Sequence, residues 1–168
     1  SRIIGPETIT LHNVKFTFLE LSSTMPALKN TFLLATSTAT LGALLALLIA
    51  YIVARKAVRG YRVLGFLATA PLAIPGIVLG VGLFLAYTRP PLVLYGTLWI
   101  LLIAFVTIAL PAAYQQLQSA FRSVHTDLAD ASRILGSTRL RTLRDITAPL
   151  LRTSVIATWC FIFVGVIR

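Results

Sequence analysis

Charge is scarce in this sequence. Charged residues make up 12% of the 168-residue chain and hydrophobic residues 57%. Soluble domains average about 25% charged and about 45–50% apolar residues, so this balance excludes a disordered chain and a water-soluble enzyme. Acidic residues are scarcest, with 5 Asp and Glu against 15 Lys and Arg and a net charge of +10. Such an excess indicates nucleic-acid binding in a soluble protein, but here the charges separate long uncharged runs. We therefore expect a membrane protein with no nucleic-acid partner.

Cysteine and an initiator methionine are the next absences. Cys160 is the only cysteine, which excludes a disulfide within the chain and a disulfide-rich secreted module. The first thirty residues lack the basic start and apolar core of a signal peptide. Because the chain starts without Met and its last apolar run stops at Arg168, we expect a piece of a longer protein.

Long uncharged runs dominate what is present. A helix needs about 20 apolar residues to cross a bilayer, and three runs are long enough. The last run, 153–167, reaches only roughly 22 Å as a helix. We expect spans at about 31–54, 63–88 and 94–117, with a truncated span at 153–168. The predicted fold is all-α, a polytopic transmembrane helical bundle.

The basic residues predict the orientation of the bundle. The loop after the first span carries four of them, the next loop carries only Arg89, and the stretch 122–152 carries six arginines. Short cytoplasmic loops are rich in Lys and Arg. We therefore expect a multi-pass protein of a plasma membrane in which 122–152 is a cytoplasmic loop and 1–30 is an extracytoplasmic segment.

Prolines interrupt the second span. Pro71, Pro75 and Gly76 lie near its middle. Proline removes a backbone donor and clashes with the preceding turn, so we expect this helix to bend or break. In lipid, the freed carbonyls need partners in the protein or in a water-filled cavity. Two interpretations stay open, a kink that faces a transport pathway and a kink that serves packing alone.

The three complete spans contain no ionisable side chain other than tyrosine. Proton pumps and voltage sensors need charged groups at membrane depth, so the sequence argues against both and indicates another source of energy. Hydroxyl side chains are present, and we expect each to bond back to its own helix rather than to contact a substrate. These residues are Thr36, Ser37, Thr38, Thr40, Thr69 and Thr107.

Small residues recur at a spacing of four in two spans. Gly76 and Gly80 form a GxxxG pattern, and Gly42, Ala46 and Ala50 repeat the spacing. Such spacing is frequent by chance in membrane helices, so we expect ordinary close packing at both places rather than a dimer motif.

The loop 122–152 has a helical pattern of its own. Thr126 or Asp127 can cap one helix, Gly136 suits its end, and Ser137 can cap a second helix that Pro149 ends. One side of the second helix would carry Leu140, Leu143, Ile146 and Leu150. From these residues alone, the pair is either an amphipathic surface element attracted to anionic lipid or a docking element for a cytoplasmic partner.

The same loop resembles the EAA loop of ABC importer permeases. That pattern is Glu-Ala-Ala, three residues, Gly, nine residues, and Ile-x-Leu-Pro. The matching positions here are Asp130, Ala131, Ser132, Gly136, Ile146 and Pro149. The spacing agrees throughout, and the departures are Asp for Glu, Ser for the second Ala, and Ala148 for Leu. The resemblance implies that this cytoplasmic two-helix loop couples the membrane domain, 31–168, to an ATPase.

The likeness extends over roughly residues 8–168, which resemble the carboxy-terminal half of the two-repeat permeases of ferric iron importers. It implies a permease subunit in a bacterial-type inner membrane that forms the translocation path. Its partners would be a cytoplasmic ATP-binding subunit, an extracytoplasmic substrate-binding protein and a second permease half, fused or separate. Ferric iron is the expected substrate. Relatives that import thiamine, polyamines, phosphonates or sulfate share the loop, so those solutes are alternatives.

Catalysis is not expected of this chain. It has no GxxxxGK[ST] phosphate-binding loop, so ATP hydrolysis belongs to a separate subunit. We expect no cofactor and no metal site, because His12 and His125 are predicted on opposite sides of the membrane. An intramembrane enzyme would need polar catalytic groups at depth, and the spans contain no convincing set. A non-transporting scaffold whose basic loop binds lipid or a soluble partner stays open as the alternative.

Overall fold

A computed structural model describes residues 24–123, 138, 145 and 147–168. The chain divides into two compact units, residues 1–33 and 34–168. Of the first unit the described part is helical from Thr24 onward. The second unit contains the rest of that helix and the remaining described helices. Most of the expected extracytoplasmic segment, 1–30, lies outside the described residues.

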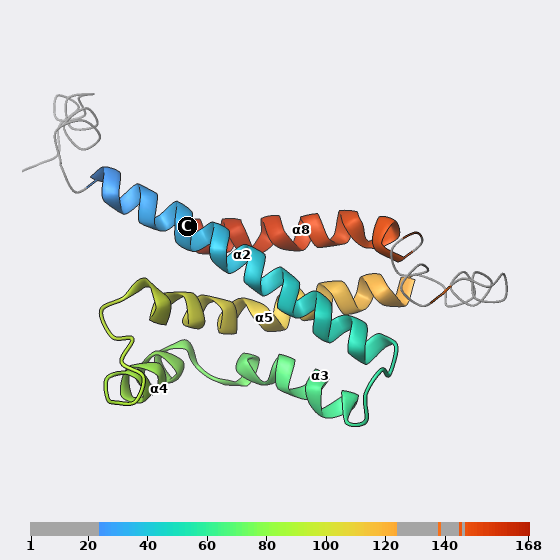
Figure 1. Cartoon of the computed structure of the whole chain (residues 1–168), viewed down its shortest axis with the longest axis horizontal. Coiled ribbons are helices and arrows are strands. Elements are labelled where there is room, and N and C mark those ends of the chain that lie inside the picture. Colours follow the sequence, from blue (N-terminus) through green and yellow to red (C-terminus); the bar gives the residue numbers. More distant parts are fainter. Residues whose placement is uncertain (1–23, 124–137, 139–144, 146) are drawn as a thin grey trace, which may run out of the picture. The chain divides into compact units, whose positions relative to one another are not determined.

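Every described element is a helix, as the sequence predicts (Figure 1). The elements are α2 (Thr24–Ala54), α3 (Tyr61–Thr69), the 3₁₀-helix η3 (Ala70–Ala73), α4 (Gly76–Tyr87), α5 (Leu98–Ser123) and α8 (Ala148–Ile167). Three of them, α2, α5 and α8, are long and apolar enough to cross a membrane, and the bent pair α3–η3 and α4 makes a fourth span if it is counted as one. The polytopic helical fold is therefore confirmed for the described part of the chain.

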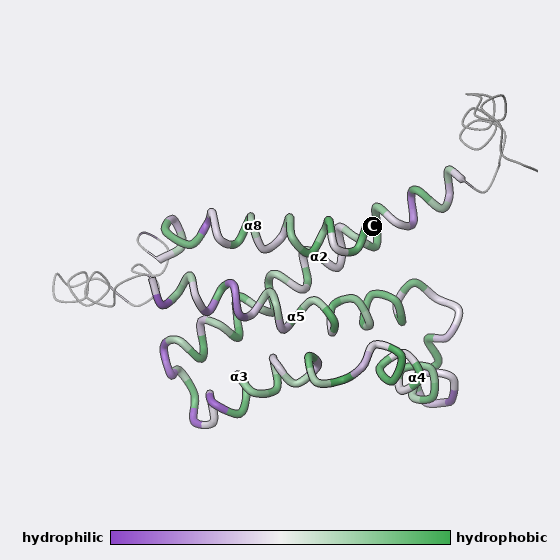
Figure 2. The backbone as a smooth tube through the Cα atoms, turned by 180° about the vertical axis from the view of Figure 1, so that it is seen from behind, coloured by the Kyte–Doolittle hydropathy of each residue, from purple (hydrophilic) through white to green (hydrophobic). Residues whose placement is uncertain are grey.

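The core lies where α5 contacts its neighbours. This helix packs against α8 and against the broken span formed by α3, η3 and α4, and α2 adds small side chains to the same core. The most deeply buried apolar residues are Ala35, Ala39, Ala46 and Ala50 of α2, Ala68 of α3, Ala113 and Leu117 of α5, and Ile162 of α8. Large apolar side chains instead lie mostly on the outside, and apolar residues predominate along the helices (Figure 2). This distribution suits a protein whose outer surface contacts lipid.

Small residues allow α2 to approach α8 closely. Gly42, Ala46 and Ala50 are all buried, and a β-carbon at Gly42 would lie 3.2 Å from Cδ1 of Ile162. The expected close packing on this helix is thus confirmed. It is not found at Gly76 and Gly80, where a β-carbon would meet no described atom within 4 Å.

The helices differ from the expected spans mainly at their ends. α2 begins at Thr24, before the expected 31–54, whereas α5 runs from Leu98 to Ser123 and is therefore shifted toward the C-terminus relative to the expected 94–117. The last helix begins at Ala148 rather than at 153, with Pro149 in its first turn. Proline is well tolerated there because first-turn N–H groups have no intrahelical partner. The placement of Leu150 in a second loop helix was therefore wrong, since Leu150 belongs to α8.

Candidate coupling and pathway sites

The predicted coupling residues lie mostly outside the described part of the chain. Asp130, Ala131, Ser132, Gly136 and Ile146 all fall there, and so does most of the expected helix pair. Pro149 is described and lies in the first turn of α8. The structure therefore describes the two helices that flank the loop and not the docking element itself.

Both flanking helices present their loop-side ends to the same region. Phe121 of α5 and Thr147, just before α8, line one pocket together with Tyr51, near the end of α2. The rings of Tyr51 and Phe121 are 6.2 Å apart, centroid to centroid, and tilted by 56°. Aromatic pairs at such separations add to the energy of burial. The C-terminal end of α2 therefore contacts the C-terminal end of α5, where the loop begins.

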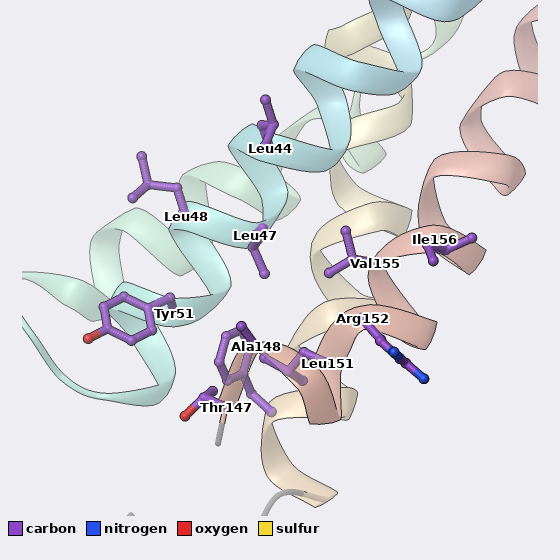
Figure 3. A pocket seen from close by; sticks show the side chains of 11 residues that line it. Leu44, Leu47, Leu48, Tyr51, Thr147, Ala148, Leu151, Arg152, Val155 and Ile156 are labelled. Atoms are coloured by element: carbon purple, nitrogen blue, oxygen red, sulfur yellow. The ribbon is translucent and has the colours of Figure 1, made fainter. Parts of the chain in front are cut away.

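The pocket beside these ends is an apolar groove, here called the α2–α8 groove, with a volume of about 580 Å³. Its lining residues are Leu44, Leu47, Leu48 and Tyr51 of α2, Phe121 of α5, Thr147, and Ala148, Leu151, Arg152, Val155 and Ile156 of α8. Figure 3 shows Leu47 and Val155 facing each other across it. Because the groove adjoins both ends of the loop, any shift of the loop relative to α2 must change its shape.

The broken span holds the candidate pathway kink. Between Tyr61–Ala73 and Gly76–Tyr87 the chain turns by 106°, so the predicted bend is confirmed. Ile74 is extended, with φ −97° and ψ 118°, as expected before a proline. Pro75 has no N–H for the carbonyl of Pro71, and the amide of Ile74 donates to that oxygen instead, at 3.1 Å. The η3 turn therefore satisfies one of the carbonyls that the prolines leave free.

Gly76 begins α4 directly after the bend. This residue is exposed, and a β-carbon on it would meet no described atom within 4 Å. Both η3 and α4 contact α5, so the bend is held against the middle of the bundle.

Some of the hydroxyl groups in the spans donate to a carbonyl of their own helix, as predicted, and others do not. Thr40 donates to the carbonyl of Thr36 at 2.8 Å, and Thr107 donates to that of Ile103 at 2.7 Å. Thr69 likewise donates to a carbonyl of its own helix. The prediction was wrong for Thr36 and Thr38, whose buried Oγ1 atoms have no hydrogen-bond partner among the described residues.

Amide side chains on α5 are the polar groups that the sequence reasoning missed. The hydroxyl of Thr158 on α8 donates to Oε1 of Gln116 at 3.0 Å. Nε1 of Trp159 donates to Oγ1 of Thr40 on α2 at 3.1 Å, and the buried Oε1 of Gln118 has no partner within the part of the chain that the structure describes. The available signal was the group Gln115, Gln116 and Gln118 in an uncharged run. Because these amides are neutral, the absence of charged side chains from the spans gives no indication of them.

Comparison with known proteins identifies the family. Residues 42–168 match the family described as binding-protein-dependent transport system inner membrane component. The chain belongs to this permease family. Members are the permease component of an ABC importer and not its ATPase, so the expected absence of an ATPase in this chain and its expected inner-membrane location both agree with the family.

Individual relatives carry several transport descriptions. The permease is 35% identical over 94% of its length to "Ferric transport system permease protein FbpB" of Actinobacillus pleuropneumoniae, of which it covers 23%. It is 35% identical over 95% of its length to "Putative ABC transporter permease protein ORF1" of Streptomyces antibioticus, covering 68%. It is also 30% identical over 77% of its length to "Molybdate/tungstate transport system permease protein WtpB" of Pyrococcus abyssi, covering 51%. The chain thus spans about a quarter of the ferric relative.

Proposed function

We propose that this permease forms part of the translocation path of an ATP-driven importer and receives the motion of a cytoplasmic ATPase through the loop 122–152. The observation that carries the proposal is the spaced motif from Asp130 to Pro149, which follows α5 in the sequence and ends in the first turn of α8, in a chain that belongs to the permease family. The small residues Ala131 and Ser132 would let the expected loop helix fit into a groove on an ATPase subunit. A carboxylate such as Asp130 can accept a charge-assisted hydrogen bond from a basic partner.

The helices that flank the loop are suited to transmit such a motion. α5 and α8 contact each other along the bundle, and Thr158 is hydrogen-bonded to Gln116 across that contact. Packed helices move as rigid elements rather than deforming continuously. A displacement of the loop would therefore move both helices together, and α5 would transmit it to η3 and α4.

The kink at Pro71, Pro75 and Gly76 is our candidate for the pathway itself. Irregular backbone at membrane depth is tolerated where it is buried in protein or lines a water-filled cavity. The exposed Gly76 and the absence of described atoms around its β-carbon position support the second alternative. We infer that the second permease half faces this bend and completes the path.

Ferric iron is the proposed substrate. Its support is the 35% identity to the ferric permease of A. pleuropneumoniae and the same identity to a putative ferric permease of Haemophilus influenzae. Molybdate or tungstate and 2-aminoethylphosphonate are the alternatives named by other relatives. Thiamine, polyamines and sulfate are further alternatives, because importers of these solutes share the loop pattern.

Substrate and coupling are tested separately. Membrane vesicles that contain the full-length permease, its ATPase and its binding protein should accumulate radioactive iron only with ATP, and a hundredfold excess of molybdate or 2-aminoethylphosphonate should not compete. Competition by either anion would reassign the substrate. For coupling, Ser132→Cys should cross-link to the ATPase subunit. A Cys placed at Ile77, exposed on α4, should not, and equal yields at both positions would contradict the docking proposal.

A further inference from the structure

The α2–α8 groove has a deep apolar floor and open apolar rims. Leu151 and Phe121 on the floor are 3% and 7% exposed, whereas Leu44 and Leu48 on the α2 rim and Ile156 on the α8 rim are more than half exposed. The rims lie on membrane-spanning helices, so the groove can open sideways into the bilayer. A volume of about 580 Å³ is in the range of pockets that bind drug-sized ligands, roughly 300–1,000 Å³.

One charge borders this apolar groove. Arg152 is the single ionisable side chain other than Tyr51 among the described residues that line it, and no carboxylate lines it. Figure 3 shows the guanidinium extending away from the leucines of α2, and Arg152 is exposed. Arginine commonly places its apolar stem along a hydrophobic surface and its charge at the water boundary.

The position of Arg152 along α8 matches the depth of lipid headgroups. It lies in the early part of Ala148–Ile167 and is the last residue of the stretch 122–152, which its six arginines predict to be cytoplasmic. Anionic headgroups are attracted to basic side chains in pockets between helices on that side. An apolar groove with a cation at its headgroup end is complementary to an anionic phospholipid, in both charge and polarity.

We propose that the α2–α8 groove binds one acyl chain of an anionic phospholipid of the cytoplasmic leaflet, with the lipid phosphate at Arg152. The lipid would fill the space between the ends of α2 and α8, beside both attachment points of the coupling loop. This goes beyond the proposed transport function, and its readout does not depend on which solute is carried.

The experiment uses the full-length protein in nanodiscs with a phosphatidylglycerol that carries a photoreactive diazirine in its acyl chain. Peptides covering 44–51 and 148–156 should be labelled, and phosphatidylcholine with the same chain should label them about fivefold less. That factor is what one cationic side chain contributes at a membrane surface. Equal labelling by the two lipids would overturn the proposal. An absence of label from both peptides would also overturn it, because another segment would then occupy the groove.

Variants separate the charge from the apolar groove. Arg152→Gln should lower phosphatidylglycerol labelling about fivefold, whereas Arg152→Lys should retain it. Arg59→Gln, an exposed cation outside the groove, should have no effect. Val155→Phe should fill the groove and remove the label, and Ile77→Phe, 84% exposed on α4, is its control. Unchanged labelling in Arg152→Gln and Val155→Phe would place the lipid elsewhere.

Discussion

A β-carbon at Gly65 would lie 2.9 Å from the hydroxyl oxygen of Tyr114. Real β-carbons essentially never approach another heavy atom so closely, so α3 and α5 meet here because residue 65 has no side chain. Tyr114 is 8% exposed and has little room to move aside. The contact fixes the first half of the broken span to the central helix, next to the bend.

Gly65→Ala should therefore destabilise the protein, because the new methyl group overlaps the Tyr114 hydroxyl. Overpacking of this kind costs about 1–3 kcal/mol. Removing the hydroxyl should make room, so Gly65→Ala combined with Tyr114→Phe should recover most of the loss. The measurement is the thermal unfolding midpoint of the purified full-length protein in detergent, read as a double-mutant cycle.

The matched control is Gly80→Ala, since a β-carbon there meets no described atom within 4 Å and alanine favours a helix. Its midpoint should stay the same or rise. If Gly65→Ala also left the unfolding midpoint unchanged or raised it, α3 and α5 would not approach each other as closely as the structure shows.

The hydrogen bond between Thr158 and Gln116 gives a second prediction. Thr158 is 1% exposed, and its replacement by valine keeps the shape but removes the donor to Oε1 of Gln116. Hydrogen bonds between membrane helices average about 0.6 kcal/mol, with a maximum near 1.7. Thr158→Val should lower stability by that order, and unfolding in detergent by a denaturant series is the measurement.

Gln116→Leu distinguishes the bond from simple packing. In a Thr158→Val background the glutamine has already lost this donor, so its replacement should cost less than it does in the wild type. Additive losses in the double variant would show that the two side chains do not interact.

The bend in the broken span gives a third prediction. Replacing Pro71 and Pro75 by alanine restores both backbone donors and removes both ring clashes. Spin labels at Val63 and Leu85, both exposed, should then move apart toward about 33 Å, the length of 22 residues of straight helix. Double electron–electron resonance on the full-length protein measures the distance between the two spin labels.

Pro90→Ala serves as the comparison, because Pro90 follows α4 and lies outside the labelled interval. It should leave the distance unchanged. An unchanged distance in the Pro71 and Pro75 variant as well would show that packing on α5, and not proline, maintains the bend.

The sequence predicted the features that depend on local chemistry. Uncharged runs are long enough to cross a bilayer whatever their neighbours are, and proline breaks a helix by removing its own donor. The bend at Pro71 and Pro75 was therefore predictable, although its angle of 106° was not. The angle depends on how η3 and α4 pack against α5, and no local pattern encodes that packing.

Contacts between residues that are far apart in the sequence could not be predicted from it. Thr158 and Gln116 are 42 positions apart, and Trp159 and Thr40 are 119 apart. Each residue alone looks like an ordinary member of a membrane helix, and only the crossing of α2, α5 and α8 brings the pairs together. The α2–α8 groove is of the same kind, since three helices supply its lining.

The last prediction concerns Gly136, whose role rests on the loop motif. A glycine after a short helix commonly takes a left-handed conformation that ends the helix, and a β-branched residue adopts positive φ only at a high energy cost. Gly136→Val should therefore abolish ATP hydrolysis stimulated by the binding protein while leaving membrane insertion intact. Gly165→Val is the control, because a β-carbon at Gly165 meets no described atom within 4 Å. If Gly136→Val supported transport at the wild-type rate, loop 122–152 would not be the coupling element, and the scaffold interpretation of its basic surface would have to be reconsidered.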